Sequence, residues 1–440
     1  MDSPANIIGT IEPALTPRGG KARVFLFLQG PHGPFFSTLG RALEACGATC
    51  LRVGFNTADA VFWPRWKSYI PFRGNQDDWQ DFLRQLIAEK SVTDIVLYGD
   101  TRWMHDAAKT IAKQHSITCH VFEEGYLRPY WVTYEKNGAN GYSAIRNMDI
   151  RQMHDAMTHP RLNPPVPPCH WGDTRQHIFY GALYHWFVML WNQRYPSFRP
   201  HRSLCVRREF VLHFIRYLLL PVHAVERHLA TRRIKNGSFP FHLALLQLAH
   251  DASFRDHGPF KSQAEFLDLV LSTFAKGAPS HHHLVFKAHP LEDGRTPLKK
   301  DIRRLARAKG LAARVHFVRG GKLARLLDVA ASAVTVNSTA GQQALWRGIP
   351  LRALGTAVYD KPELVSNQAL AAFFANPQPP DKRAYAHFRD YLLHTSQIPG
   401  GYYTRPGRQQ IVRCVTDMML FDTRKLPQNA TDTQQYATVS

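Results

Sequence analysis

The residues best suited to chemistry in this chain stand where apolar runs end. Glu123 and Glu124 close the run TCHVFEEG, where two adjacent acids are poorly placed for packing. Successive side chains of a strand point to opposite sides, so one carboxylate can face a cleft while the other is held by structure. A carboxylate in a cleft can act as a base or as a nucleophile at an anomeric carbon. The alternative is a capped helix start or a surface loop.

A second candidate is the pair His289-Pro290 in VFKAHPLEDG, at the expected end of another strand. An imidazole there can donate a hydrogen bond to a leaving phosphate, and Lys287 adds positive charge. Most His-Pro pairs are ordinary turns, so this pair indicates a functional site only in combination with a second motif.

The second motif is VTVNSTAGQQALWRGI, in which a strand is expected to end at Asn337. Ser338 and Thr339 follow, and Gly341 lies in the opening turn of a helix. Free backbone N–H groups, a helix N-terminus and two hydroxyls aimed at one point predict a phosphate site. The alternative is an ordinary Ser/Thr helix cap.

Other strand ends carry polar residues that point to the same cleft. QGPHGPFF places Gln29 and His32 over the edge of the first sheet, and YGDTRWMH places Asp100 and Arg102 at the next strand end. Gln247 opens the contribution of the second half. Each of these residues alone is weak evidence for a functional site, because an Asp at the end of a strand is often only a helix cap.

Arg128 follows the acidic pair and can hold a substrate carboxylate through two hydrogen bonds. The sequence has no Asp-x-Asp triplet and no spacing typical of a metal cage, and HHH (281–283) fits a surface position. We therefore expect no metal in the mechanism.

The elements that must position these residues alternate between strand and helix. One series covers 22–125, and a second begins at FPFHLALLQL and ends at PLRAL (350–354). This alternation predicts an α/β fold of two Rossmann-like domains facing a cleft at the carboxyl ends of both sheets, the GT-B-type glycosyltransferase arrangement. A helical stretch is expected at 381–423, and loose tails at 1–20 and 424–440.

The segment 159–236 interrupts this alternation with apolar, aromatic stretches. From Trp171 to Lys235 it carries 11 Lys and Arg against three acids. One interpretation is an inserted helical hairpin that packs on the core. The other is an interfacial membrane patch, because apolar faces rimmed with Arg suit anionic lipid.

Composition sets the outer limits. With 440 residues, 44% hydrophobic and 20% charged, the chain is long enough for two domains and is not disordered, collagen-like or a coiled coil. A net charge of +21 predicts an anionic partner. Six scattered cysteines favour a reducing compartment, and no signal peptide or membrane-spanning run is apparent. We expect a cytoplasmic protein that touches a membrane.

At these motifs the chain resembles the capsule polysaccharide synthesis and export family, specifically its KpsS-type β-Kdo transferases. The resemblance spans about residues 23–410, in the family's order. The motifs that carry it are QGPHGPFF, YGDTRWMH, EEGYLRPYWVTYEKNGANG, FKAHPLEDG, NSTAGQQALWRGIPLRALGTAVYD and QIPGGYY. The acidic pair, His-Pro and Ser-Thr are also similar to transferases that use CMP-activated sialic acids.

The resemblance implies a metal-independent enzyme that transfers β-Kdo from CMP-Kdo to phosphatidylglycerol or lysophosphatidylglycerol, with retention and without a further cofactor. It implies an acceptor domain at 21–158, a nucleotide-sugar domain at 237–380, and work on the cytoplasmic face of the inner membrane beside other capsule proteins. Glu124 ranks first as the catalytic carboxylate, Glu123 second and Asp100 third. Related Kdo transferases carry Asp at the position of Glu124.

Three rival hypotheses stay open. The protein could be a non-catalytic relative that couples lipid-linked glycan to the export machinery, or an enzyme for a UDP-sugar or CMP-sialic acid donor. A nucleic-acid binder has only the net charge in its favour, since no nucleic-acid-binding motif appears.

Overall fold

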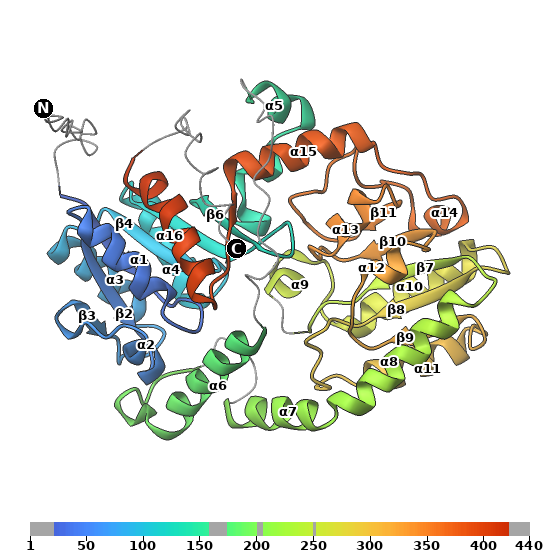
Figure 1. Ribbon diagram of the computed structural model, residues 1–440, viewed down its shortest axis with the longest axis horizontal. Helices are drawn as coiled ribbons and strands as arrows, with labels where there is room; N and C mark the ends of the chain where they lie inside the picture. Colours follow the sequence, from blue (N-terminus) through green and yellow to red (C-terminus); the bar gives the residue numbers. More distant parts are fainter. Residues whose placement is uncertain (1–21, 158–173, 200–205, 250–251, 422–440) are drawn as a thin grey trace, which may run out of the picture.

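The computed structural model describes residues 22–157, 174–199, 206–249 and 252–421. The two expected tails and residues 159–173 and 200–205 of the insertion lie outside the described residues. Two sheets face each other, and a line of helices runs along one side of both (Figure 1).

The first sheet has seven strands in the order β12-β6-β5-β4-β1-β2-β3. Strands β1 to β5 are parallel, because helices cross between them, whereas β6 and β12 run antiparallel. The bounds are β1 Val24–Phe27, β2 Thr49–Gly54, β3 Tyr69–Pro71, β4 Asp94–Tyr98, β5 Thr118–Glu124, β6 Trp131–Lys136 and β12 Gln397–Pro399.

The second sheet has five parallel strands in the order β11-β10-β7-β8-β9. Its central strands are buried along their whole length, as expected for a sheet covered on both faces. The bounds are β7 Phe241–Leu245, β8 His283–Lys287, β9 Val315–Val318, β10 Ser332–Thr335 and β11 Leu351–Ala353. The predicted two-sheet α/β class is confirmed.

Sixteen α-helices lie in the described residues, most of them connecting successive strands. Those of the first half are α1 Phe35–Ala45, α2 Thr57–Val61, α3 Trp79–Lys90, α4 Trp103–Gln114 and α5 Ile150–Asp155. The inserted ones are α6 Thr174–Leu190, α7 Val206–Leu218 and α8 Leu220–Lys235. The rest are α9 Ala252–His257, α10 Gln263–Gly277, α11 Leu298–Ala308, α12 Ala324–Leu327, α13 Gly341–Trp346, α14 Leu370–Ala375, α15 Lys382–Thr395 and α16 Arg405–Leu420.

The end of the chain returns to the first sheet. The helical stretch expected at 381–423 consists of two helices, α15 and α16, and between them lies the edge strand β12, which the sequence analysis missed. Ile411, Val415 and Met419 recur on one face of α16 and are buried in the same core cluster as residues of α1. The two halves of the molecule are thereby joined twice, once through the insertion and once through this return.

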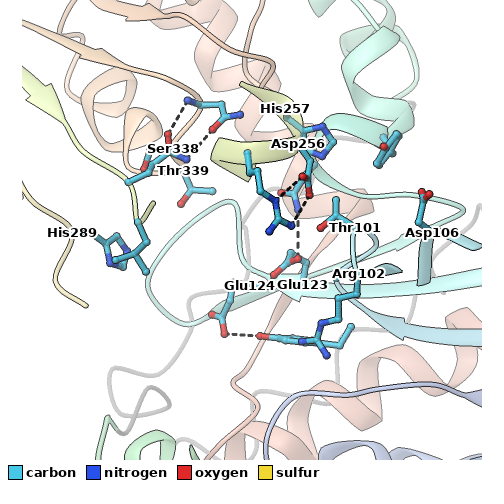
Figure 2. Close-up of a pocket in the computed structure, with 18 of the residues that line it drawn as sticks. Thr101, Arg102, Asp106, Glu123, Glu124, Asp256, His257, His289, Ser338 and Thr339 are labelled. Carbon is cyan, nitrogen blue, oxygen red and sulfur yellow. Dashed lines mark hydrogen bonds and ion pairs between the residues drawn. The ribbon is translucent and has the colours of Figure 1, made fainter. Parts of the chain in front are cut away.

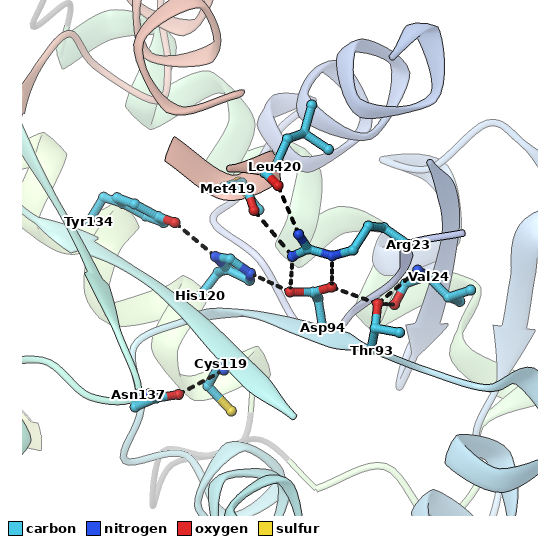
Figure 3. A network of polar contacts seen from close by, with 10 residues as sticks. All are labelled: Arg23, Val24, Thr93, Asp94, Cys119, His120, Tyr134, Asn137, Met419 and Leu420. Atoms are coloured by element: carbon cyan, nitrogen blue, oxygen red, sulfur yellow. Dashed lines mark hydrogen bonds and ion pairs between the residues drawn. The ribbon is translucent and has the colours of Figure 1, made fainter. Parts of the chain in front are cut away.

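A buried ion pair fastens this return (Figure 3). Arg23 holds both carboxylate oxygens of Asp94 at 2.7 and 2.5 Å and also donates to the carbonyls of Met419 and Leu420. Burial alone would raise the pKa of Asp94, but the hydrogen bonds from His120 and Arg23 outweigh it and lower the pKa to about 2. The pair therefore stays ionised and anchors the end of α16 to β4.

In its described residues, 174–199 and 206–236, the insertion is helical, as expected, but these helices are not a hairpin on one core. Helix α6 packs against α2 beside the first sheet, whereas α8 packs against β9 at the edge of the second (Figure 1). Within the described residues, none of the helices combines the length and the hydropathy needed to cross a bilayer.

Candidate active site between the two sheets

A cleft of about 740 Å³ lies between the carboxyl ends of the two sheets. Parallel strands deliver the residues that follow them to one edge, so both halves of the chain contribute to one cavity. The predicted residues that line it are Arg102, Glu123, Glu124, Arg128, Gln247, His289, Asn337, Ser338 and Thr339. Figure 2 shows the two glutamates on one wall and His289, Ser338 and Thr339 on the other.

Both acidic side chains line the cleft, which corrects the expectation that only one of them would. Glu123 accepts hydrogen bonds from the backbone N–H of Glu124 at 3.0 Å and from the Asn140 amide at 3.5 Å. Burial, reinforced by the charges of Glu124 and Asp100, raises the pKa of Glu123 to about 7. A carboxyl that titrates near neutrality can both take and give a proton.

Glu124 has a different partner. Its Oε1 accepts a hydrogen bond from the hydroxyl of Tyr98 at 3.1 Å. Burial raises the pKa of Tyr98 well above its usual value, and the charge of Glu124 adds to the effect, so this phenol stays a donor. A carboxylate held by a fixed donor is oriented for attack on a bound sugar.

On the opposite wall, His289 is a neutral hydrogen-bond donor. Burial and the positive charges of Arg128 and Lys287 lower the pKa of His289 to about 4. Its Nδ1 accepts from the backbone N–H of Leu291 at 3.1 Å, which assigns the proton to Nε2. The ring can thus donate one hydrogen bond to an anionic group in the cleft.

The expected array of free N–H groups before α13 is not found. The N–H of Asn337 donates to the Gln247 side chain at 3.1 Å, that of Ala340 to Ser338 Oγ at 3.2 Å, and that of Gly341 to Ser338 O at 2.9 Å. Gln247 also donates to Asn337 Oδ1 at 2.8 Å, so this pair braces the turn. Ser338 and Thr339 line the cleft, so this turn offers their hydroxyls to a ligand rather than an array of backbone N–H groups.

Gly341 lies behind this turn and not on the cleft wall. A Cβ at Gly341 would come within 2.7 Å of the Tyr359 hydroxyl, so the glycine is needed for packing. Lys287 and Pro290 also lie off the wall. The buried Lys287 ammonium donates to Ala288 O at 3.1 Å, and burial lowers its pKa to about 8.

Asp100 does not face the cleft, because its buried carboxylate accepts from the backbone N–H of Ala139 at 2.9 Å. That contact fixes the loop after β6 and removes Asp100 from direct chemistry.

Gln29 and His32 also lie outside the cleft. Gln29 is buried, and its carbonyl accepts from Arg102 at 2.8 Å, so it positions a cleft residue instead of touching a ligand. His32 stacks on Tyr184 of α6 with ring centroids 4.3 Å apart. Both predictions fail for the same reason: α6 covers this strand end.

The sequence analysis missed the contribution of α9, which brings Asp256 and His257 into the cleft above Glu123 (Figure 2). Burial lowers the pKa of His257 although Asp100 and Asp256 act against it. Its buried Nε2 has no hydrogen-bond partner among the described residues. The polar residues RDH (255–257) follow closely after the strand that ends before Gln247 and could have indicated this contribution. Their spacing, however, is not typical of a catalytic or binding motif.

A search of the described ranges finds no group of three His, Cys, Asp or Glu side chains that could hold a metal ion.

Comparison with known proteins settles the family. Residues 93–403 match the family described as capsule polysaccharide biosynthesis protein. The chain belongs to this family. It is 32% identical over 383 residues to the capsule polysaccharide export protein KpsS of Escherichia coli, covering 86% of this chain and 96% of that protein. It is equally 32% identical to the capsule polysaccharide modification protein LipB of Neisseria meningitidis serogroup B, covering 87% and 92%.

Solved structures give looser matches to this capsule biosynthesis family member. KpsC of Thermosulfurimonas dismutans, a beta Kdo 2,7 transferase, is 12% identical with a TM-score of 0.37 and covers 84% of this chain and 99% of its own. The UDP-GlcNAc 2-epimerase of Neisseria meningitidis is 11% identical with a TM-score of 0.31, covering 91% and 100%.

Proposed function

We propose that this protein transfers Kdo from CMP-Kdo to a phosphatidylglycerol-type lipid, with retention and without a metal, on the cytoplasmic face of the inner membrane. One observation carries the proposal. In a chain of the capsule family, two carboxylates on one wall of a cleft face a neutral histidine and two hydroxyls on the other. Carboxylates opposite uncharged hydrogen-bond donors suit a glycosyl transfer, because one wall can act on the sugar while the other holds the leaving phosphate.

The second wall would hold the phosphate of CMP. His289 offers its Nε2–H, and Ser338 and Thr339 offer hydroxyl donors. These donors stabilise the negative charge that develops on the phosphate of CMP as it leaves. The phosphate can leave without taking up a proton.

The first wall would hold Kdo and carry the transfer. Arg128 lines the cleft and is anchored through its Nε–H to Gly125 O at 3.0 Å, which directs its charge to the Kdo carboxylate. The Glu124 carboxylate attacks the anomeric carbon, the bond from that carbon to the phosphate oxygen breaks, and CMP departs with the electron pair.

A second displacement completes the reaction. Glu123 takes the proton of the acceptor hydroxyl, the alkoxide oxygen attacks the same anomeric carbon, and the bond to Glu124 breaks. Two inversions give net retention, so the β linkage of the donor becomes a β linkage in the product. Other capsule synthesis and export proteins would receive this lipid.

Release of CMP from CMP-Kdo tests this proposal, measured with and without a short-chain phosphatidylglycerol and with a chelator present. We expect release that depends on the acceptor and continues in the chelator. A protein that leaves CMP-Kdo intact would instead be a non-catalytic partner of the export machinery, and turnover of another activated sugar alone would reassign the donor.

A further inference from the structure

Helices α7 and α8 turn an apolar face outward. The α7–α8 ridge is defined by eight of the exposed apolar residues of this segment: Phe210, Val211, Phe214, Ile215, Leu218, Val222, Val225 and Leu229. Tyr217, Leu219 and Leu220 are exposed as well. The eight ridge residues are between 39% and 64% exposed, and a turn of 100° per residue places them along one side of the two helices. A helix on a globular protein normally buries its apolar face, whereas here a charged residue, Glu209 on the opposite side of α7, is buried.

The charged residues of α7 and α8 also leave a positive charge around the ridge. Residues 206–235 contain seven Lys and Arg and two Glu. Glu209 is paired with Arg295 at 3.3 Å, and Glu226 is paired with Lys299 and Arg319. Both acids are therefore bound to cations of the second half of the molecule, and the charge around the ridge is positive.

Two basic hollows lie near α8. One, of about 580 Å³, is lined by no Asp or Glu and has six basic residues: Arg227, His228, Arg232, Lys235, Lys322 and Arg325. The other, of about 750 Å³, is lined mainly by residues of α11 and the loop before it, of which Lys299 pairs with Glu226 of α8. It has six cations and a single acid, Glu292. Cationic hollows beside an exposed apolar stripe match the two layers of a lipid surface, with headgroup phosphates outside and acyl chains beneath.

We propose that the α7–α8 ridge is the surface on which this protein binds an anionic lipid bilayer. Positive charge near the ridge complements anionic headgroups and repels a second copy of a chain that carries a net charge of +21. Helix α6, which lies in the same line of inserted helices (Figure 1), exposes Trp186, and Trp191 directly after its end is also exposed. Tryptophan favours the boundary between headgroups and acyl chains.

The ridge is tied directly to the candidate active site. Arg216 of α7 donates to the carbonyl of Pro290 at 3.0 Å, next to His289 on the cleft wall. A bilayer held at the ridge is thus adjacent to the loop that would hold the donor phosphate. This step rests on the proposed function, because a lipid acceptor has to be taken from a bilayer.

Vesicle flotation tests the ridge with the full-length protein. The vesicles contain either equal parts of phosphatidylglycerol and phosphatidylcholine or phosphatidylcholine alone. The test variant is Phe214→Ser/Leu218→Ser, and the matched control is Leu269→Ser/Trp346→Ser, which removes exposed apolar side chains from α10 and α13. Thermal unfolding confirms that each variant is folded.

We expect the protein to float with anionic vesicles at low salt, less at high salt, and weakly with phosphatidylcholine alone. The ridge variant should lower the bound fraction about tenfold and the control should leave it unchanged. The variant Arg232→Gln/Lys235→Gln should reduce the salt-dependent part of binding.

The inference is overturned if the protein does not float, or if the ridge variant floats as well as the control. A dimer that the ridge variant abolishes, without flotation, would assign the surface to a second copy. Flotation involves no transfer, and CMP release with a soluble short-chain acceptor involves no bilayer. Failure of the ridge and failure of the proposed function are therefore distinguishable.

Discussion

The hydroxyl of Tyr98 donates a hydrogen bond to the carboxylate of Glu124 at 3.1 Å, joining the ends of β4 and β5. The two strands are parallel neighbours, so the sheet itself fixes the distance between the phenol and the carboxylate. This contact orients the Glu124 carboxylate from the neighbouring strand.

Replacing Tyr98 should therefore impair transfer without unfolding the protein. In Tyr98→Phe the ring stays and the donor is lost, and a hydrogen bond to a charged group contributes about 1.5–3 kcal/mol. We expect kcat to fall about tenfold or more with little change in KM for CMP-Kdo. Tyr217→Phe on the exposed α7 is the control, and equal kcat values for the two variants would count against a role for this contact.

The rate of transfer should depend on pH through Glu123. Its pKa is raised to about 7, so the carboxyl is protonated below that pH and cannot accept the proton of the acceptor. We expect kcat to fall about tenfold for each pH unit below 7 and to level off above it. Glu123→Gln should be slow at every pH; a variant that keeps the step near pH 7 would show that another group titrates.

His289 should contribute to binding of the donor and not of the acceptor. Removing its Nε2–H in His289→Ala should weaken CMP binding about tenfold, the usual effect of one hydrogen bond to a charged group. Calorimetric titration with CMP measures this. His281→Ala is the matched control, since His281 is exposed and lies before β8; equal CMP affinities in both variants would remove His289 from the phosphate site.

Two histidine pairs at the amino edge of the second sheet should make the protein sensitive to acid. His283 lies 2.8 Å from His316, and His242 lies 2.9 Å from His282. Burial lowers the pKa of His316 to about 4 and that of His242 to about 3. As pH falls below about 6.5, the unfolded chain binds protons that the folded chain excludes, so the free energy of unfolding decreases.

Thermal unfolding between pH 7 and pH 5 checks this, and His283→Asn/His316→Asn should lose less stability over that interval than the wild-type chain. Identical pH profiles for both proteins would contradict the assignment.

Lys361 joins the two halves of the molecule. Its buried ammonium donates to the carbonyls of Ile145, Arg146 and Met148 at 3.1, 2.5 and 2.5 Å. Lys361→Met would leave these carbonyls without their donor and should lower the free energy of unfolding by about 2–3 kcal/mol. Chemical denaturation measures the change. The exposed Lys276→Met should be neutral, and a neutral Lys361→Met would show that the carbonyls are satisfied without it.

Except for the three-residue edge strand β3, the parallel strands could be predicted from sequence, and so could the residues that end them. Glu123, His289 and Ser338 were found because a buried strand reads as a short apolar run and a parallel sheet brings such ends together. The strands β6 and β12 were missed because neither lies in a strand-helix-strand repeat. Strand β12 forms only by pairing with β6, which lies more than 250 residues earlier.

The remaining wrong predictions of site residues arise from side-chain contacts with segments that are distant in the sequence. Gln29 and His32 were predicted to lie in the cleft because nothing in the motif QGPHGPFF indicates that α6 covers them. Asp256 and His257 were missed because α9 is short and has no periodic pattern to detect. The N–H groups before α13 were expected to be free, but Gln247 of another strand end accepts one of them.

The mass of the lipid product tests the central claim most directly. The wild-type protein, Glu124→Gln and the exposed control Glu363→Gln are each incubated with CMP-Kdo, a fluorescent phosphatidylglycerol and a chelator, and the lipids are analysed by mass spectrometry. The account predicts lipid plus one Kdo from the wild type and the control, and loss of that product in Glu124→Gln. A wild-type reaction that leaves CMP-Kdo and lipid unchanged would contradict it, and an undiminished yield from Glu124→Gln would remove Glu124 from the mechanism.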